Sequence, residues 1–139
     1  MGRLTINVDG GARGNPGPAA VGVVVRDADG EVVEEVGERI GVATNNVAEY
    51  RALLLGIERA AALGADELEL IGDSELIVRQ VKGDYKVKQA ALRDLHTQVK
   101  QALAPFGRWS VRHVRREENS EADRLVNEAL DRGDALPPR

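Results

Sequence analysis

The chain has 139 residues, of which 42% are hydrophobic, so it is long enough for one domain with a buried core. The absence of cysteine excludes disulfides and thiolate metal sites, and no stretch forms a signal peptide or approaches the roughly 20 apolar residues of a membrane span. We expect a soluble, cytoplasmic monomer, and the net charge of −4 argues against a nucleic-acid partner unless a local basic patch binds it.

The first third of the chain has the patterns of β-strands. Leu4–Asp9 alternates apolar and polar residues, which predicts a strand with one buried face. The Gly/Pro/Asn-rich stretch Gly10–Pro18 is predicted to be a loop without regular structure. Val21–Arg26 and Glu31–Ile40 are rich in β-branched residues and flank the turn sequence Asp27–Gly30, so they predict a hairpin.

The rest of the chain alternates helices with strands. The predicted helices are Thr44–Leu63, Asp73–Val81, Lys88–Leu103 and Ser120–Asp131, and the predicted strands are Glu67–Ile71 and Trp109–Val114. This order predicts a layered α/β domain on a mixed sheet over residues 1–131, followed by a C-terminal tail over residues 132–139.

Four acidic residues occupy the ends of these elements, and each has a purely structural interpretation. Asp9 precedes two glycines and is able to open a turn. Glu49 and Asp123 each follow an Asn or Ser by three residues, which is the spacing of a capping box. Asp73 stands where a helix N-cap is expected. Taken one at a time, the acids do not reveal a site.

Together, the same four acids predict a metal site. Asp9 and Asp73 end predicted strands, where ligands bind in open α/β sheets, and Glu49 and Asp123 lie in the first turns of helices that pack on that sheet. Carboxylates that converge raise one another's pKa unless cations are present. An all-oxygen acidic site selects Mg²⁺ or Mn²⁺, and two such ions about 4 Å apart are suited to phosphodiester hydrolysis.

Five segments resemble the ordered motifs of the ribonuclease HI family. They are Val8–Gly11, Gly14–Pro18, Ala43–Tyr50, Gly72–Ser74 and Asn119–Asp123. The resemblance spans nearly the whole chain, in the same order and spacing. It implies a ribonuclease H-like fold, a five-stranded mixed sheet with helices on both faces. It also implies hydrolysis of the RNA strand of RNA/DNA hybrids with two metal ions, leaving 3′-hydroxyl and 5′-phosphate ends.

The resemblance also assigns residues to roles. Asp9, Glu49, Asp73 and Asp123 match the metal-binding acids of the family. The candidate contacts to the substrate in this part of the chain are Gly10, Gly11, Asn15, Thr44, Asn45 and Asn46. The asparagines match positions that contact the hybrid across its minor groove, where short amides can read the 2′-hydroxyl, and the threonine matches a position that holds a DNA phosphate. Alternatively, these asparagines stabilise turns and cap helices.

The chain departs from the best-known bacterial members before its last acid. Those enzymes carry a histidine on a mobile loop at this point, whereas the segment Val114–Asn119 has none. Arg116 is the candidate replacement, acting on phosphate charge rather than by proton transfer, and Arg115 is the alternative. A solvated run of charges is the other interpretation of this segment.

The basic, Trp-rich insertion of those enzymes is also absent. Lys82–Lys88 stands in its place, and Lys86 and Lys88 are candidate phosphate contacts, with a solvated helix junction as an equally good explanation. In this respect the chain resembles the short archaeal and actinobacterial type of ribonuclease HI, which is sometimes the first domain of a two-domain protein.

Three other functions fit part of the evidence. A strand followed by Asp-Gly-Gly also resembles the phosphate-binding opening of actin-like ATPases and sugar kinases, but those proteins need a second similar domain. A nuclease with a preference for double-stranded RNA has the same acids. A non-catalytic hybrid-binding module does not need all four.

Overall fold

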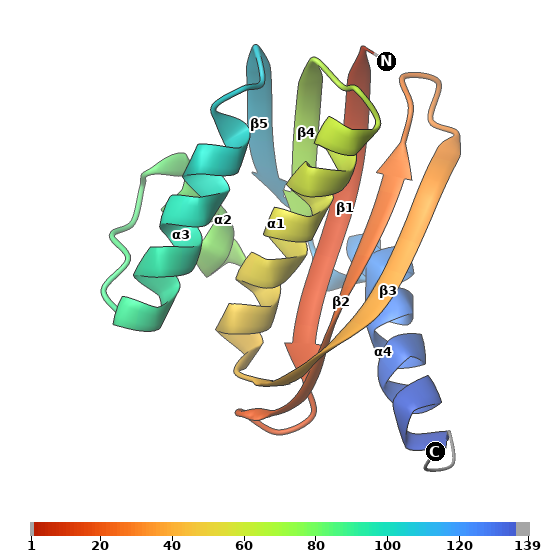
Figure 1. The fold of residues 1–139 in the computed structure, drawn as a ribbon, viewed down its shortest axis with the longest axis vertical. Coiled ribbons are helices and arrows are strands. Elements are labelled where there is room, and N and C mark those ends of the chain that lie inside the picture. Colours follow the sequence, from red (N-terminus) through yellow and green to blue (C-terminus); the bar gives the residue numbers. More distant parts are fainter. Residues whose placement is uncertain (1, 136–139) are drawn as a thin grey trace.

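Every predicted strand and helix is present in the structure, a computed structural model that describes residues 2–135 (Figure 1). The strands are β1 (Arg3–Ala12), β2 (Gly17–Arg26), β3 (Val32–Ala43), β4 (Glu67–Gly72) and β5 (Arg108–His113). The helices are α1 (Asn45–Ala62), α2 (Glu75–Lys82), α3 (Ala90–Leu103) and α4 (Ser120–Ala135), with a 3₁₀ turn, η1 (Arg116–Asn119), before the last. None of the described helices is long and apolar enough to cross a membrane.

The five strands form one mixed sheet in the order β3-β2-β1-β4-β5. β1, β2 and β3 pair antiparallel, while β1 pairs parallel with β4 and β4 parallel with β5. The strand β1 is therefore central, and its carboxyl end lies beside that of β4. This topology brings Asp9 and Asp73 to the same end of the sheet, as the predicted mixed sheet requires.

Helices cover both faces of the sheet. Figure 1 shows α1 and α3 in front of the sheet and α4 behind it. On the α1 face, the alternation in β1 places Leu4, Ile6 and Val8 in the main core, each no more than 1% exposed. On the other face, α4 packs its apolar side on β2, mainly against Ala20 and Val24. The predicted five-stranded sheet with helices on both faces is confirmed.

The predicted loop Gly10–Pro18 is wrong at both of its ends. The strand β1 continues to Ala12 and β2 begins at Gly17, because residues 10–12 pair antiparallel with residues 19–21. Local glycine content suggested a loop, but this pairing with a distant strand overrides it.

Most other differences are shifts of element ends. The helix α4 extends to Ala135, four residues past the predicted end at Asp131, so the predicted tail over 132–139 begins within it. Residues 136–139 lie outside the described part of the chain.

Gly10 allows β1 and α1 to approach each other closely at the end of the sheet. A Cβ atom at this position would lie 2.2 Å from the carbonyl oxygen of Ala48 on α1. The neighbouring Gly11 faces the other side, where a Cβ atom would meet only Val126 Cγ1, at 3.9 Å. Gly10 thus has a packing reason to be glycine, and Gly11 does not.

We predict that Gly10→Ala lowers the free energy of unfolding by about 1–3 kcal/mol, the usual range for an overpacked site, because α1 must move away from β1. Gly11→Ala is the matched control and is expected to change it by less than about 0.5 kcal/mol. Urea denaturation of both variants measures the difference. Equal losses in the two variants would contradict the close approach at Gly10.

Candidate active site

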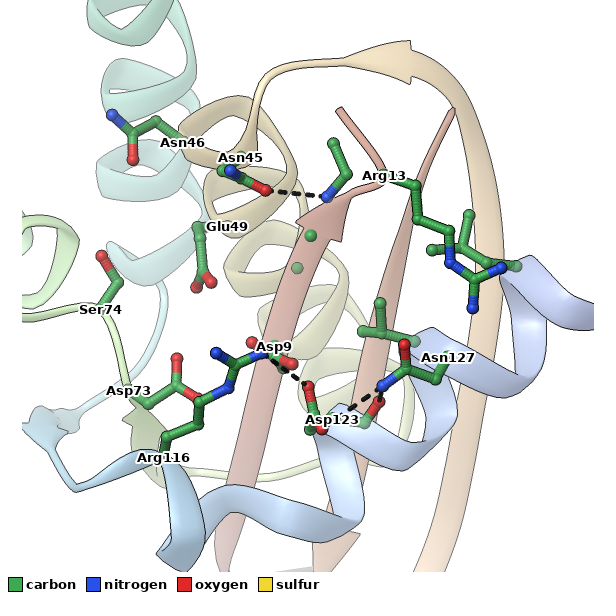
Figure 2. Close-up of a pocket in the computed structure, with 15 residues that line it drawn as sticks. Asp9, Arg13, Asn45, Asn46, Glu49, Asp73, Ser74, Arg116, Asp123 and Asn127 are labelled. Atoms are coloured by element: carbon green, nitrogen blue, oxygen red, sulfur yellow. Dashed lines mark hydrogen bonds and ion pairs between the residues drawn. The ribbon is translucent and has the colours of Figure 1, made fainter. Parts of the chain in front are cut away.

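The four predicted acids meet in one cavity of about 520 Å³ at the carboxyl ends of β1 and β4. Figure 2 shows them directed into it from β1, α1, the end of β4 and α4. Carboxylate oxygens of Asp9, Glu49 and Asp73 all lie within 4.8 Å of one another. Asp123 joins them from the first turn of α4. Asp9 is nearly buried, at 6% exposure, and the other three are half-buried.

The turn and cap interpretations of three of these acids are wrong. Asp9 lies inside β1, where it pairs with Gly22 of β2, and does not open a turn. The cap of α1 is Thr44, whose hydroxyl accepts a hydrogen bond from the Val47 N–H at 3.2 Å, so Glu49 has no capping partner at Asn46.

The helix α2 is likewise capped by the residue that follows Asp73. Ser74 accepts a hydrogen bond from the Ile77 N–H at 3.4 Å and so serves as N-cap in place of Asp73. Because Thr44 and Ser74 cap the two helices, the carboxylates of Glu49 and Asp73 are available to the cavity.

Burial and mutual repulsion make these carboxyl groups hard to ionise. Burial, then the charges of Asp73 and Asp123, raise the pKa of Asp9 to about 8. Burial likewise raises the pKa of Glu49 well above its usual value, helped by the charges of Asp9 and Asp73 and opposed by a hydrogen bond from the Gly10 backbone. A cation that entered the cavity would relieve both effects.

The pKa of Asp73 is also raised. Burial raises its pKa, while a hydrogen bond from Asn119 and the charge of Arg116 act against that rise. Both compensating groups come from η1, so this short turn supplies the neutral donor and the positive charge closest to Asp73.

Arg116 points into the cavity, and Arg115 is not among the residues that line it. The guanidinium of Arg116 lies 3.8 Å from Asp123 Oδ1, and 81% of the side chain is exposed (Figure 2). Arg115 is instead the N-cap residue of η1, and its backbone N–H donates to Glu118 at 3.4 Å. The structure therefore places Arg116, but not Arg115, beside the acids.

The predicted asparagines hold the end of β1 against the start of α1. Asn15 Oδ1 accepts from the Asn45 N–H at 3.0 Å, and Asn45 Oδ1 accepts from the Ala12 N–H at 2.9 Å. The side-chain oxygens of Asn15 and Asn45 therefore already accept hydrogen bonds within the fold. Asn45 and Asn46 line the cavity, as do Gly10 and Gly11, whereas Asn15 and the cap residue Thr44 do not.

The two predicted lysines belong to a second cavity next to the first. Lys86 and Lys88 line this space of about 480 Å³ together with Tyr85 and Gln80, and Asn46 borders both cavities. Lys86 and Lys88 are exposed. The lysines therefore lie beside the acidic cavity but do not enter it.

Two asparagines near the acids were not predicted. Asn127 donates to Asp123 Oδ2 at 3.4 Å, and its position four residues later on α4 is a signal that helical spacing offers. Asn119 is 1% exposed and lowers the pKa of Asp73, and it lies within the motif Asn119–Asp123. Nothing in the sequence indicates that it is buried.

Comparisons with known proteins agree on one family. The family model described as reverse transcriptase-like matches residues 7–129. Ribonuclease HI of Halobacterium salinarum is 48% identical over 130 residues, which cover 94% of this chain and 65% of that protein. A bifunctional protein of Mycobacterium tuberculosis is 46% identical over 130 residues, covering 93% of this chain and 36% of that protein. The chain thus spans two thirds or less of the length of these relatives.

Solved structures agree with the fold. The crystal structure of the RNase H1 from Halobacterium salinarum matches with a TM-score of 0.92 at 47% identity, covering 94% of this chain and 98% of that one. The crystal structure of LC11-RNase H1 in complex with an RNA/DNA hybrid matches with a TM-score of 0.90 at 43% identity, covering 95% of this chain and 99% of that one.

We predict that metal-free protein loses stability as the pH rises from about 4 to about 8. The pKa of Asp9 is higher in the folded chain than its ordinary value of 3.8, so the fold favours the protonated carboxyl. That contribution is complete below the ordinary value and disappears as the pH passes about 8. Asp9→Asn keeps a neutral side chain throughout, so its melting temperature should exceed that of the wild type increasingly across this range.

Thermal unfolding of both proteins in EDTA measures the effect, and Asp27→Asn, in the turn between β2 and β3, is the control. Added Mg²⁺ should raise the melting temperature of the wild type more than that of Asp9→Asn, because a ligand stabilises the state that binds it. Parallel melting curves at every pH would show that crowding of the acids does not strain the fold.

Proposed function

This chain belongs to the ribonuclease HI family, and we propose that it is an endoribonuclease that hydrolyses the RNA strand of RNA/DNA hybrids. The proposed products carry 3′-hydroxyl and 5′-phosphate ends. The observation that carries the proposal is the convergence of four carboxylates in one cavity, three of them with oxygens within 4.8 Å of one another.

The acids fit divalent cations. All the donor atoms are carboxylate oxygens, which Mg²⁺ and Mn²⁺ prefer, and the crowded negative charge favours cation binding. Asp9, Glu49, Asp73 and Asp123 would hold two ions, with Asp9 central because its pKa is affected by all three of the others. When bound, the ions would supply Lewis-acid stabilisation of the charge that develops on the phosphodiester.

The residues around the acids are suited to a hybrid. RNA differs from DNA by its 2′-hydroxyl, which short amides are able to recognise in a wide, shallow groove. Asn45 and Asn46 line the acidic cavity, and Asn15 lies on the adjoining loop, in contact with Asn45. In the neighbouring cavity, Lys86 and Lys88 provide positive charge for phosphates, which offsets the negative net charge of the chain locally.

Arg116 is suited to hold a phosphate group during the reaction. Its planar guanidinium is permanently charged, forms paired hydrogen bonds with phosphate oxygens and stands at the open side of the acids. It does not take up a proton at neutral pH, so its role is to hold charge in place rather than to act as acid or base.

We predict that Asp73→Asn lowers the rate of hybrid cleavage on the order of 10²- to 10³-fold, because a ligand to the cations is lost while the helix cap at Ser74 remains. The assay compares labelled RNA/DNA hybrid, double-stranded RNA and double-stranded DNA in Mg²⁺ or Mn²⁺. Asp27→Asn is the matched control, because the same substitution at a turn remote from the cavity should leave the rate unchanged.

This cleavage assay, with hybrid binding and ATP hydrolysis measured beside it, distinguishes the alternatives. Cleavage confined to the RNA of the hybrid supports the proposal, and equal cleavage of double-stranded RNA favours the alternative nuclease. Binding of hybrid without cleavage indicates a non-catalytic module, and ATP hydrolysis alone indicates the ATPase alternative. Undiminished cleavage by Asp73→Asn would refute the assignment of the site.

We predict that Arg116→Ala lowers kcat roughly 10- to 100-fold, the loss expected for one hydrogen bond to a charged group. Arg116→Lys should restore part of the rate, because it keeps the charge but not the planar fork. Arg115→Ala, at the neighbouring exposed position, should stay within about twofold of the wild type. If Arg115→Ala is the more damaging change in steady-state assays, the two arginines have been assigned the wrong way round.

A further inference from the structure

Asn119 is a buried polar side chain that has no function in the reaction proposed above. Only 1% of it is exposed, and Asp9, Gln80 and Asn119 are the buried polar or charged residues in the described part of the chain. It lies at the end of η1, directly before the first residue of α4. Burial of an amide is unfavourable unless its donors and acceptor are satisfied, so its partners are informative.

The Asn119 amide forms two hydrogen bonds to β1. Its Nδ2 donates to the Val8 carbonyl at 2.8 Å, and its Oδ1 accepts from Asn7 Nδ2 at 3.0 Å. It also lies close enough to the carboxyl group of Asp73 to lower the pKa of that group. Val8 directly precedes Asp9 in β1, so the amide holds the residue next to one acid and lies near the carboxyl group of another.

These contacts lie where the two central strands separate. The parallel pairing of β1 with β4 begins at Arg3 and Glu67 and stops at Asn7 and Ile71. Just beyond that last pair, the chain carries the two acids Asp9 and Asp73. Asn119 is hydrogen-bonded to β1 at this point and lies near Asp73, the residue that follows β4.

We propose that Asn119 is a positioning residue that sets the spacing of Asp9 and Asp73 for the divalent cations. The same residue fixes the start of α4, four residues before Asp123. Asn119 therefore connects three of the four acids. The inference rests on the proposed metal-dependent function, but it concerns cation binding and can be tested apart from cleavage.

An amide is suited to this role because it is neutral. Carboxylates that face one another repel, and the backbone pairing of β1 with β4 stops at Asn7 and Ile71, before both acids. A lysine here would satisfy Asp73 but compete with the cations, and an aspartate would add a negative charge. Asparagine donates to the Val8 carbonyl and lowers the pKa of Asp73 without changing the charge of the cluster.

The test measures Mn²⁺ binding to metal-free protein by the paramagnetic resonance signal of free Mn²⁺. We expect Asn119→Ala to weaken Mn²⁺ binding about 10- to 100-fold, as is usual when a partner of a metal ligand is removed. In hybrid cleavage at a fixed Mn²⁺ concentration, kcat should fall while KM for hybrid stays within about twofold, because the substrate contacts are untouched.

Asn7→Ala is the matched control. It removes one hydrogen bond from the same network but leaves the contacts to Val8 and Asp73, so Mn²⁺ affinity should stay within about twofold of the wild type. Asn119→Ser serves where the alanine variant does not fold, because its hydroxyl retains a donor and an intermediate affinity is expected. The melting temperature of each variant is recorded beside its affinity.

Two results would overturn the proposal. One is a folded Asn119→Ala or Asn119→Ser variant with wild-type Mn²⁺ affinity. The other is equal weakening by Asn7→Ala, which would indicate general loosening of the fold. If the wild type binds Mn²⁺ but does not cleave hybrid, the proposed function fails, and the Mn²⁺ titrations still decide the role of Asn119.

Discussion

The repulsion among four carboxylates at one end of the sheet is the constraint on which the site depends. Burial and neighbouring charges raise the pKa of Asp9 to about 8, and the pKa values of Glu49 and Asp73 also rise. A fold selected only for stability would not gather these groups. The parallel pairing of β1 with β4 and the packing of α1 and α4 on opposite faces bring them together nonetheless.

The surrounding structure limits this repulsion without removing it. A backbone hydrogen bond from Gly10 acts on Glu49, the amide of Asn119 acts on Asp73, and the guanidinium of Arg116 stands beside Asp123. Each of these groups stabilises a neighbouring carboxylate, and together they do not neutralise the cluster. The remaining negative charge attracts divalent cations. The repulsion among the acids of the metal-free protein and its proposed chemistry therefore have the same origin.

The sequence predicted the sheet, the helices and the joint position of the four acids, because alternation and helical spacing are local signals. It failed for Gly10 to Ala12, where pairing with β2 and contact with α1 override a glycine-rich pattern. It also missed the cap of α1, because the spacing of Asn46 and Glu49 suggested a capping box, whereas the fold uses Thr44. The partner of Asn119 on β1 lies 111 residues earlier in the chain, beyond the reach of any local pattern.

The separate caps at Thr44 and Ser74 have a consequence for how such a chain evolves. Because neither helix start depends on its neighbouring acid, random substitution at Glu49 or Asp73 is not opposed by helix stability. Substitution at Asp9 even relieves strain in the metal-free fold. Neutral drift would therefore erase the acids readily, leaving an intact but inert scaffold. The stability of the fold therefore does not account for the four acids, and their convergence points to the chemistry of the cavity.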